Sequence, residues 1–184
     1  VRRAIQRGVA HVPEDRTGVG TAPNLSLVDN LIMKRYRSKP IGRGWTIDMG
    51  AARAAASGLK DSYEISAPSI DTQARLLSGG NIQRAVLARE LNEGCQVLIA
   101  VNPCFGLDFA ACAEIRAQLM DARNRGAAVL LISEDLDELL ELSDRLSVIC
   151  DGKLVYETDP KNAELNVLGQ YMAGHAHTEE AQAV

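Results

Sequence analysis

The sequence predicts an α/β protein built on a mostly parallel sheet that is flanked by helices. Three apolar runs, residues 96–101, 127–133 and 145–150, lack polar alternation, which is typical of strands buried on both faces of a parallel sheet. Between the first two runs, Ile115 and Leu119 recur at helical spacing. These two runs and the intervening helix therefore form the pattern of a strand–helix–strand unit.

Upstream of these runs, turn residues and helical periodicity divide the chain into shorter segments. In order, the predicted segments are a strand (9–13), a loop (14–24), a helix (26–37), an Ala-rich helix (47–65) and a connector (66–76). Ser26 or Asn24 is the expected cap of the first helix, because their side chains accept hydrogen bonds from the first helical N–H groups.

Downstream of the third run, Asp151-Gly152 predicts a hairpin turn that leads into a strand over residues 154–157. Residues 161–173 are expected to form a helix, and the tail after it is expected to fray. His175 and His177 lie in that tail and do not predict a metal site.

Composition excludes several classes of protein. The chain has 184 residues with 46% hydrophobic and 24% charged residues, which suits one globular domain with a small subdomain. Its net charge of −4 gives no general field for nucleic acid, so no nucleic-acid partner is expected. The four cysteines form no CxxC pair, so neither a disulfide framework nor a metal cluster is predicted.

One local exception is the basic segment "MKRYRSK" at residues 33–39. Its cations are Lys34, Arg35, Arg37 and Lys39. We interpret the segment as a solvated helix end, in preference to a patch for anionic lipid or nucleic acid.

A phosphate-binding pattern begins at Ser78. Gly79 and Gly80 follow it and open a helix, whose inner face is predicted to contain Ile82, Ala85 and Val86. Ser78 is a natural N-cap, the glycines allow close approach of an anion, and the helix N-terminus adds a positive dipole end. From spacing alone, however, a capped helix after a turn is the simpler interpretation.

The longer stretch of sequence around Ser78 favours the phosphate-binding interpretation. "LSGGNIQRAVLAREL" at residues 77–91 resembles the signature motif of ATP-binding-cassette (ABC) ATPases, and Asn81 followed by Gln83 is most similar to the monosaccharide and nucleoside importer group. Three other blocks resemble the family in the same order: the Q-loop region of a second cassette (8–16), the Walker B strand and D-loop (97–108), and the switch strand with its hairpin (129–155).

The resemblance implies an incomplete ABC-ATPase cassette of the P-loop NTPase type, with a small helical signature subdomain. The implied parts are a helix end, Q-loop strand and loop (1–25), the helical signature subdomain (26–94), the C-terminal part of the ATPase core (95–160), and a C-terminal helix with its tail (161–184). No Walker A motif, G-x-x-x-x-G-K-[ST], occurs in the sequence. The family places it before the Q-loop strand, so we expect the chain to be a fragment that begins after it.

Catalytic positions of the family are altered in this sequence. The Walker B Asp and Glu correspond to Val101 and Asn102, the switch His to Glu134, and the Q-loop Gln to Glu14. Valine offers no metal ligand and asparagine is a poor base, so this chain by itself is predicted to be inactive in hydrolysis, and no metal site is expected in it. The D-loop is kept as Gly106, Leu107 and Asp108.

ABC cassettes pair head to tail, and this resolves the contrast between an intact signature and a degenerate site. The resemblance implies ATP shared with a partner cassette, which would also hold the Mg²⁺. The residues implied to contact that ATP in trans are Ser78, Gly79, Gly80, Asn81 and Gln83. The implied partners are a first cassette, fused or separate, and a membrane permease reached through the helical subdomain.

The predicted function is the ATP-binding component of a sugar or nucleoside importer, cytoplasmic and peripheral at the inner face of the membrane. The alternative is a non-catalytic interaction protein that stands alone, or a decayed fragment of such a cassette. A conventional active ATPase is disfavoured, because three catalytic positions are lost together. The transported solute stays open between a pentose, a hexose and a nucleoside.

Overall fold

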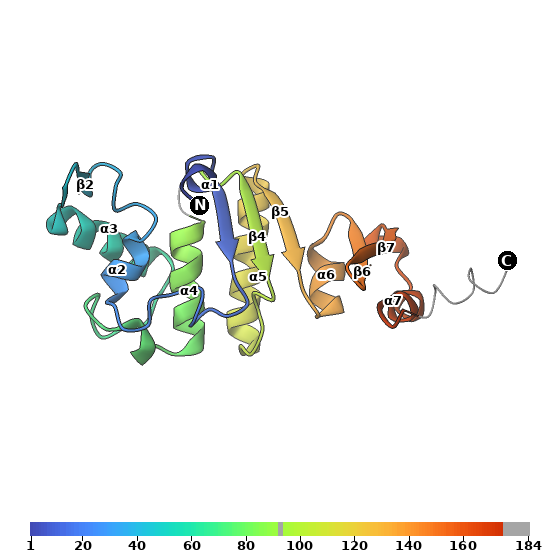
Figure 1. Cartoon of the computed structure of the whole chain (residues 1–184). Coiled ribbons are helices and arrows are strands. Elements are labelled where there is room, and N and C mark those ends of the chain that lie inside the picture. The colour runs from blue at the N-terminus through green and yellow to red at the C-terminus, as the bar shows by residue number, and fades with distance from the viewer. Residues whose placement is uncertain (92–93, 175–184) are drawn as a thin grey trace. The chain divides into compact units, whose positions relative to one another are not determined.

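The computed structural model describes residues 1–91 and 94–174 (Figure 1). The predicted tail with His175 and His177 lies outside the described residues. The chain divides into two compact units, Val1–Ile132 and Ser133–Val184, which are described separately below. The expected ATPase-core segment 95–160 therefore runs across the boundary between the units.

The sheet of the first unit has three strands, β1 (Val9–Val12), β4 (Val97–Val101) and β5 (Ala128–Ile132), in the order β1-β4-β5. Both pairs are parallel, and Val97 lies opposite Val9 on one side and Ala128 on the other. The predicted strand–helix–strand unit is thereby confirmed, and the chain reaches β1 from the short helix α1 (Arg2–Gln6).

Burial of the strands differs from the prediction. In β4, Leu98 and Ala100 are fully buried, as expected. In β5, Leu130 and Ile132 remain about half exposed, because they share with Ala128 the face of the strand that no described helix of the first unit covers, whereas the alternate residues are half-buried. The third run, predicted for the same sheet, instead forms β6 (Leu146–Cys150) in a separate antiparallel pair of the second unit.

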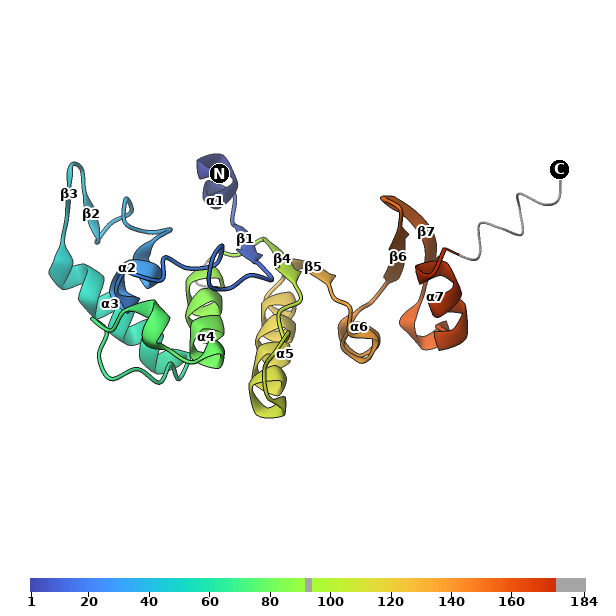
Figure 2. The ribbon, with the colours of Figure 1, turned by 60° about the horizontal axis from the view of Figure 1, so that its bottom comes forward.

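Two long helices, α4 (Gly79–Glu90) and α5 (Phe109–Asn124), lie side by side on one face of the sheet (Figure 2). The predicted inner face of α4 is confirmed, since Ile82, Ala85 and Val86 are all buried. Ile115 and Leu119 are likewise buried on α5. Both helices begin at the sheet edge where the parallel strands end, which sets their N-termini close together.

A helical subdomain packs on the other side of α4. It contains α2 (Leu27–Ile32) and α3 (Met49–Ser62), followed by the short 3₁₀ turn η1 (Ala74–Leu76). Ser26 caps α2 in a capping box with Asp29. The core of the subdomain contains apolar side chains from α2, α3 and α4. Among them are Leu27, Val28, Leu31, Ala52, Ala56, Ile82 and Ala85.

The prediction of a single helix over 26–37 is wrong in its second half. The helix ends at Ile32, and residues 33–38 form turns that lead to the short strands β2 (Gly42–Arg43) and β3 (Thr46–Ile47). The physical reason is that Ile41 is buried in the subdomain core, and the chain must turn back to place it there.

The second unit contains α6 (Leu136–Leu142), the hairpin of β6 and β7 (Lys153–Thr158), the 3₁₀ turn η2 (Pro160–Asn162) and α7 (Leu165–Met172). Asp151 and Gly152 both have positive φ angles, of 48° and 73°, so the predicted hairpin turn is confirmed. Across the described residues, no helix combines the length and apolar character that a membrane span requires.

Candidate functional site

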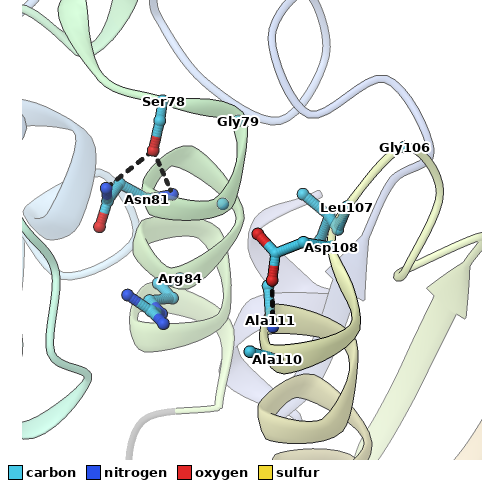
Figure 3. A pocket seen from close by; sticks show the side chains of 10 residues that line it. Ser78, Gly79, Asn81, Arg84, Gly106, Leu107, Asp108, Ala110 and Ala111 are labelled. Atoms are coloured by element: carbon cyan, nitrogen blue, oxygen red, sulfur yellow. Dashed lines mark hydrogen bonds between the residues drawn. The ribbon is translucent and has the colours of Figure 1, made fainter.

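A pocket of about 420 Å³ opens in the first unit between the N-terminal ends of α4 and α5 (Figure 3). One wall is the signature segment with Ser78, Gly79, Gly80, Asn81 and Arg84, and the other is the D-loop with Gly106, Leu107, Asp108, Ala110 and Ala111. Two motifs that are separate in the sequence are thus brought together around one space.

The α4 wall is held by its own cap. Ser78 Oγ accepts hydrogen bonds from the backbone N–H of Asn81 and, at 2.8 Å, from the Asn81 side-chain amide. The side-chain oxygen Oδ1 of Asn81 in turn accepts from the backbone N–H of Ser66 at 2.7 Å. Asn81 therefore ties the preceding connector to the helix start. The N–H groups of the first helical turn have no partner inside the helix, and they carry its positive dipole end.

The α5 wall carries a charge of the opposite kind. Asp108 caps α5 and accepts from the backbone N–H of Ala111 at 2.9 Å. Its carboxylate offsets the positive end of α5, whereas the hydroxyl of Ser78 leaves that of α4 uncompensated. Between the two helices, Arg84 Nε and Nη2 donate to one carboxylate oxygen of Glu114 at 2.9 and 2.5 Å, which fixes their spacing. An anion in the pocket is favoured on the α4 side.

Arg16 joins the two walls, and the sequence patterns did not single it out. Its Nη1 donates to the Phe105 carbonyl at 2.7 Å, and a Cβ added to Gly79 would lie 3.0 Å from its Nη2. Gly106, whose φ is +65°, also approaches this guanidinium. Within residues 1–91 and 94–174, Arg16 forms no ion pair with a carboxylate. The Arg16 guanidinium therefore lies between the signature segment and the D-loop, in space that is open because Gly79 and Gly106 have no side chains.

Gln83 is not brought to the pocket with the other signature residues. Its side chain is buried, with 1% exposure, and Nε2 donates to the Pro103 carbonyl at 2.9 Å. This location follows from helix geometry, since Gln83 lies on the face of α4 that packs toward the end of β4. In this structure Gln83 positions the signature helix and does not face the solvent-accessible space.

Three of the positions that the sequence predicts to be degenerate, Val101, Asn102 and Glu14, lie near the end of β4. Val101 is half-buried in the strand, and the next residue, Asn102, has a positive φ of 42°. The Asn102 backbone N–H donates to the Ile132 carbonyl at 2.7 Å, and its side-chain amide donates to Glu14 Oε1 at 3.2 Å. The two residues predicted to stand for the Walker B Glu and the Q-loop Gln, Asn102 and Glu14, are therefore in direct contact.

Glu134, at the position of the switch His, belongs to the second unit. It is exposed and lies just before α6, whose N-cap is Asp135.

Aromatic side chains flank the D-loop. The chain has two phenylalanines, Phe105 and Phe109, and they precede and follow Gly106–Asp108. Their exposed fractions are 65% and 96%. Apolar side chains of this size are buried in most proteins, so the rim of the pocket resembles a contact surface more than an open solvent face.

The fold is that of an ATP-binding cassette of the ABC-ATPase type. The structure matches the dimeric ATP-binding cassette MJ0796 in a post-hydrolysis state bound to ADP and Pi, with a TM-score of 0.70, 21% identity, and coverage of 86% of this chain and 66% of that one. A further dimeric structure of the same cassette gives a TM-score of 0.69. No family model matches the chain.

The chain is also similar in sequence to curated import ATP-binding proteins. The chain is 41% identical over 94% of its length to the glucose import ATP-binding protein TsgD13 of Haloferax volcanii, and 34% identical over 99% to the guanosine import ATP-binding protein NupO of Bacillus subtilis. It is 36% identical over 94% to the ribose import ATP-binding protein RbsA 1 of Rubrobacter xylanophilus. The chain is therefore related to the ATP-binding proteins of ABC importers for sugars and nucleosides. It spans about a third of their length, namely 32%, 36% and 35%.

Proposed function

We propose that this chain is part of the ATP-binding component of an importer for a sugar or nucleoside, and that its signature segment binds ATP held by a partner cassette. The observation that carries the proposal is the α4 wall of the pocket, where Gly79 and Gly80 follow a neutral cap. There the backbone N–H groups and the helix dipole favour a phosphate. Ser78 can also donate its hydroxyl to a phosphate oxygen, because its oxygen only accepts from Asn81 and its proton stays available.

The chain's own catalytic positions support a role for it in trans. Val101 has no oxygen to hold a Mg²⁺ ion, so the metal that accompanies ATP would be held by the partner cassette. Asn102 can orient a water molecule but cannot take its proton at neutral pH. It is also hydrogen bonded to Glu14, whose carboxylate would repel a γ-phosphate.

The rim of the pocket supports a docked protein surface. Phe105 and Phe109 are exposed beside the D-loop, and closure by a partner cassette would bury them. Arg16 lies behind both walls, and we propose that it keeps the D-loop and the signature helix in register during closure. A membrane permease, contacted through the helical subdomain, would place this component at the inner face of the membrane.

Gly80 allows a sharp test, because an added methyl group would disturb the nucleotide more than the chain. A Cβ at Gly80 would meet Ala111 Cβ at 4.0 Å, an ordinary contact, whereas Gly58 on α3 faces open space and serves as the matched control. Both Gly→Ala changes lie within helices and should leave the free energy of unfolding equal or higher.

The experiment replaces the matching segment of NupO with this chain and measures ATP turnover of the purified chimera. We expect turnover in the chimera and no loss in Gly58→Ala. Gly80→Ala keeps its backbone N–H, but the added methyl group should hold the phosphate away from it, so we expect a loss of roughly a hundredfold, comparable with the loss of one oxyanion donor. The chain alone should release no phosphate from MgATP. Equal turnover in the two variants would refute the role in trans, and turnover by the isolated chain would refute its own inactivity.

A further inference from the structure

A second surface of the first unit has a charge opposite to that of the whole chain. Residues 30–47 contain five cations, Lys34, Arg35, Arg37, Lys39 and Arg43, and no Asp or Glu. The chain as a whole has 24 acidic and 20 basic residues. After the last residues of α2, the segment forms turns and the β2–β3 hairpin, at the end of the first unit that lies away from the sheet (Figures 1 and 2). Residues 33–39 are therefore not the solvated helix end that the sequence predicted, and the lipid patch that was disfavoured there is reconsidered below.

The cations of this segment differ in their surroundings. Lys34 points inward, where its Nζ lies 2.6 Å from Glu90 Oε2. Arg43 pairs with Asp48 at 2.5 Å, yet its side chain remains 70% exposed. Arg37 and Lys39 are exposed and form no ion pair within the part of the chain that the structure describes. The Arg37 guanidinium lies 5.2 Å from the centre of the Tyr36 ring, so this cation is held over an aromatic face at the surface.

Large apolar side chains accompany these cations. Trp45, the single tryptophan of the chain, lies at the tip of the β2–β3 hairpin and is fully exposed. Tyr36, Ile47 and Met49 are exposed to 40%, 43% and 47%. A tryptophan with no packing partner is costly in water, and Trp and Tyr are the side chains that prefer the headgroup level of a membrane.

We propose that residues 36–49 dock on a membrane surface rich in anionic lipid, with Trp45 at the headgroup level and Arg37 and Lys39 against lipid phosphates. The charge pattern favours a lipid surface, since the segment has cations and aromatic side chains but no acidic group before Asp48. A projecting hairpin with one large side chain at its tip suits a soft headgroup layer, which needs no matching cavity. This inference is independent of the proposed role in ATP binding.

Trp45 is also the reporter for the test, because its emission is the only tryptophan emission of the chain. The full chain is mixed with vesicles of phosphatidylcholine alone, or of equal parts phosphatidylcholine and phosphatidylglycerol. We expect a blue shift and co-sedimentation with the anionic vesicles only, both weakening as salt screens the charges. Inorganic phosphate at the same ionic strength should not shift the emission. This control distinguishes binding to a lipid surface from binding to free phosphate.

The variant Arg37→Gln/Lys39→Gln should bind the anionic vesicles roughly thirtyfold more weakly, since two cations near an anionic surface are removed. The matched control, Arg145→Gln/Lys153→Gln, removes the same charge from the second unit and should bind as the unmodified chain does. Equal binding by the two variants, equal binding to both kinds of vesicle, or no binding to anionic vesicles would overturn the proposal. The last result would leave the surface to a protein partner.

Discussion

Removal of the buried Glu90 side chain should destabilise this protein strongly. It is the last residue of α4, and its side chain is 5% exposed. One carboxylate oxygen accepts from Lys34 Nζ at 2.6 Å and from the His11 backbone N–H at 2.9 Å, and the other accepts from Arg89 Nε at 2.9 Å. This carboxylate therefore joins the signature helix to β1 and to the turns after α2.

Glu90→Ala would leave two cations without their counter-ion in a place with little access to water. Arg89 is 7% exposed and Lys34 is 19% exposed, so neither can regain a full hydration shell. Removing one partner of a buried ion pair costs about 3–5 kcal/mol. We expect a value near the lower limit, about 3 kcal/mol, because Lys34 is partly solvated. Glu90→Gln should cost less, since its amide oxygen still accepts from the His11 N–H.

Urea unfolding monitored by circular dichroism measures these changes as shifts in the free energy of unfolding. The matched control is Asp121→Ala, which removes an exposed partner of Arg125 on α5 and should cost about 0–1 kcal/mol. If Glu90→Ala and Asp121→Ala destabilise the chain equally, the argument from buried charge is wrong. The Glu90→Gln variant keeps the comparison measurable should the alanine variant fail to fold.

Two further predictions concern single carboxyl groups. Asn102→Glu places a second carboxylate against Glu14 and should destabilise the chain by about 1 kcal/mol at neutral pH; adding Glu14→Gln should remove this cost, and a double-mutant cycle that shows no coupling would contradict the contact. Asp48 has a lowered pKa, chiefly because it accepts from the Ala51 backbone N–H at the start of α3 and also because Arg43 is close. A lowered pKa stabilises the fold above the ordinary value of 3.8 and loses that effect as pH falls through the folded-state value. Asp48→Asn keeps a capping oxygen, so a pH titration of the unfolding free energy should lose this acid-dependent step and no other.

Local patterns were sufficient for much of the fold and for both walls of the pocket. The cap at Ser78, the inner face of α4 and the turn at Asp151-Gly152 depend on residues close together in the sequence, and all three predictions are confirmed. The parallel unit over 96–133 was predictable because apolar runs separated by one helix have few ways to pack. The resemblance to the ABC ATPases then implied that the signature and the D-loop belong to one kind of site.

Other features required contacts between distant residues. Periodicity could not show that the helix after Ser26 ends at Ile32, because that end is set by the burial of Ile41 in a core built from three helices. Nor could it show that Gln83 turns inward to Pro103, because a polar residue on a helix has no preferred face until a buried acceptor is supplied.

The sequence by itself determined which segments are predicted to bind phosphate and which positions are predicted to be degenerate, since helix caps, glycines and missing carboxylates are properties of single residues and near neighbours. Only the tertiary structure decided how they meet. It places Arg16 between the signature and the D-loop, pairs Asn102 with Glu14, and buries Lys34 against Glu90 while exposing Trp45. These pairings join residues far apart in the chain, and their energies depend on distance and burial, which a linear pattern does not contain.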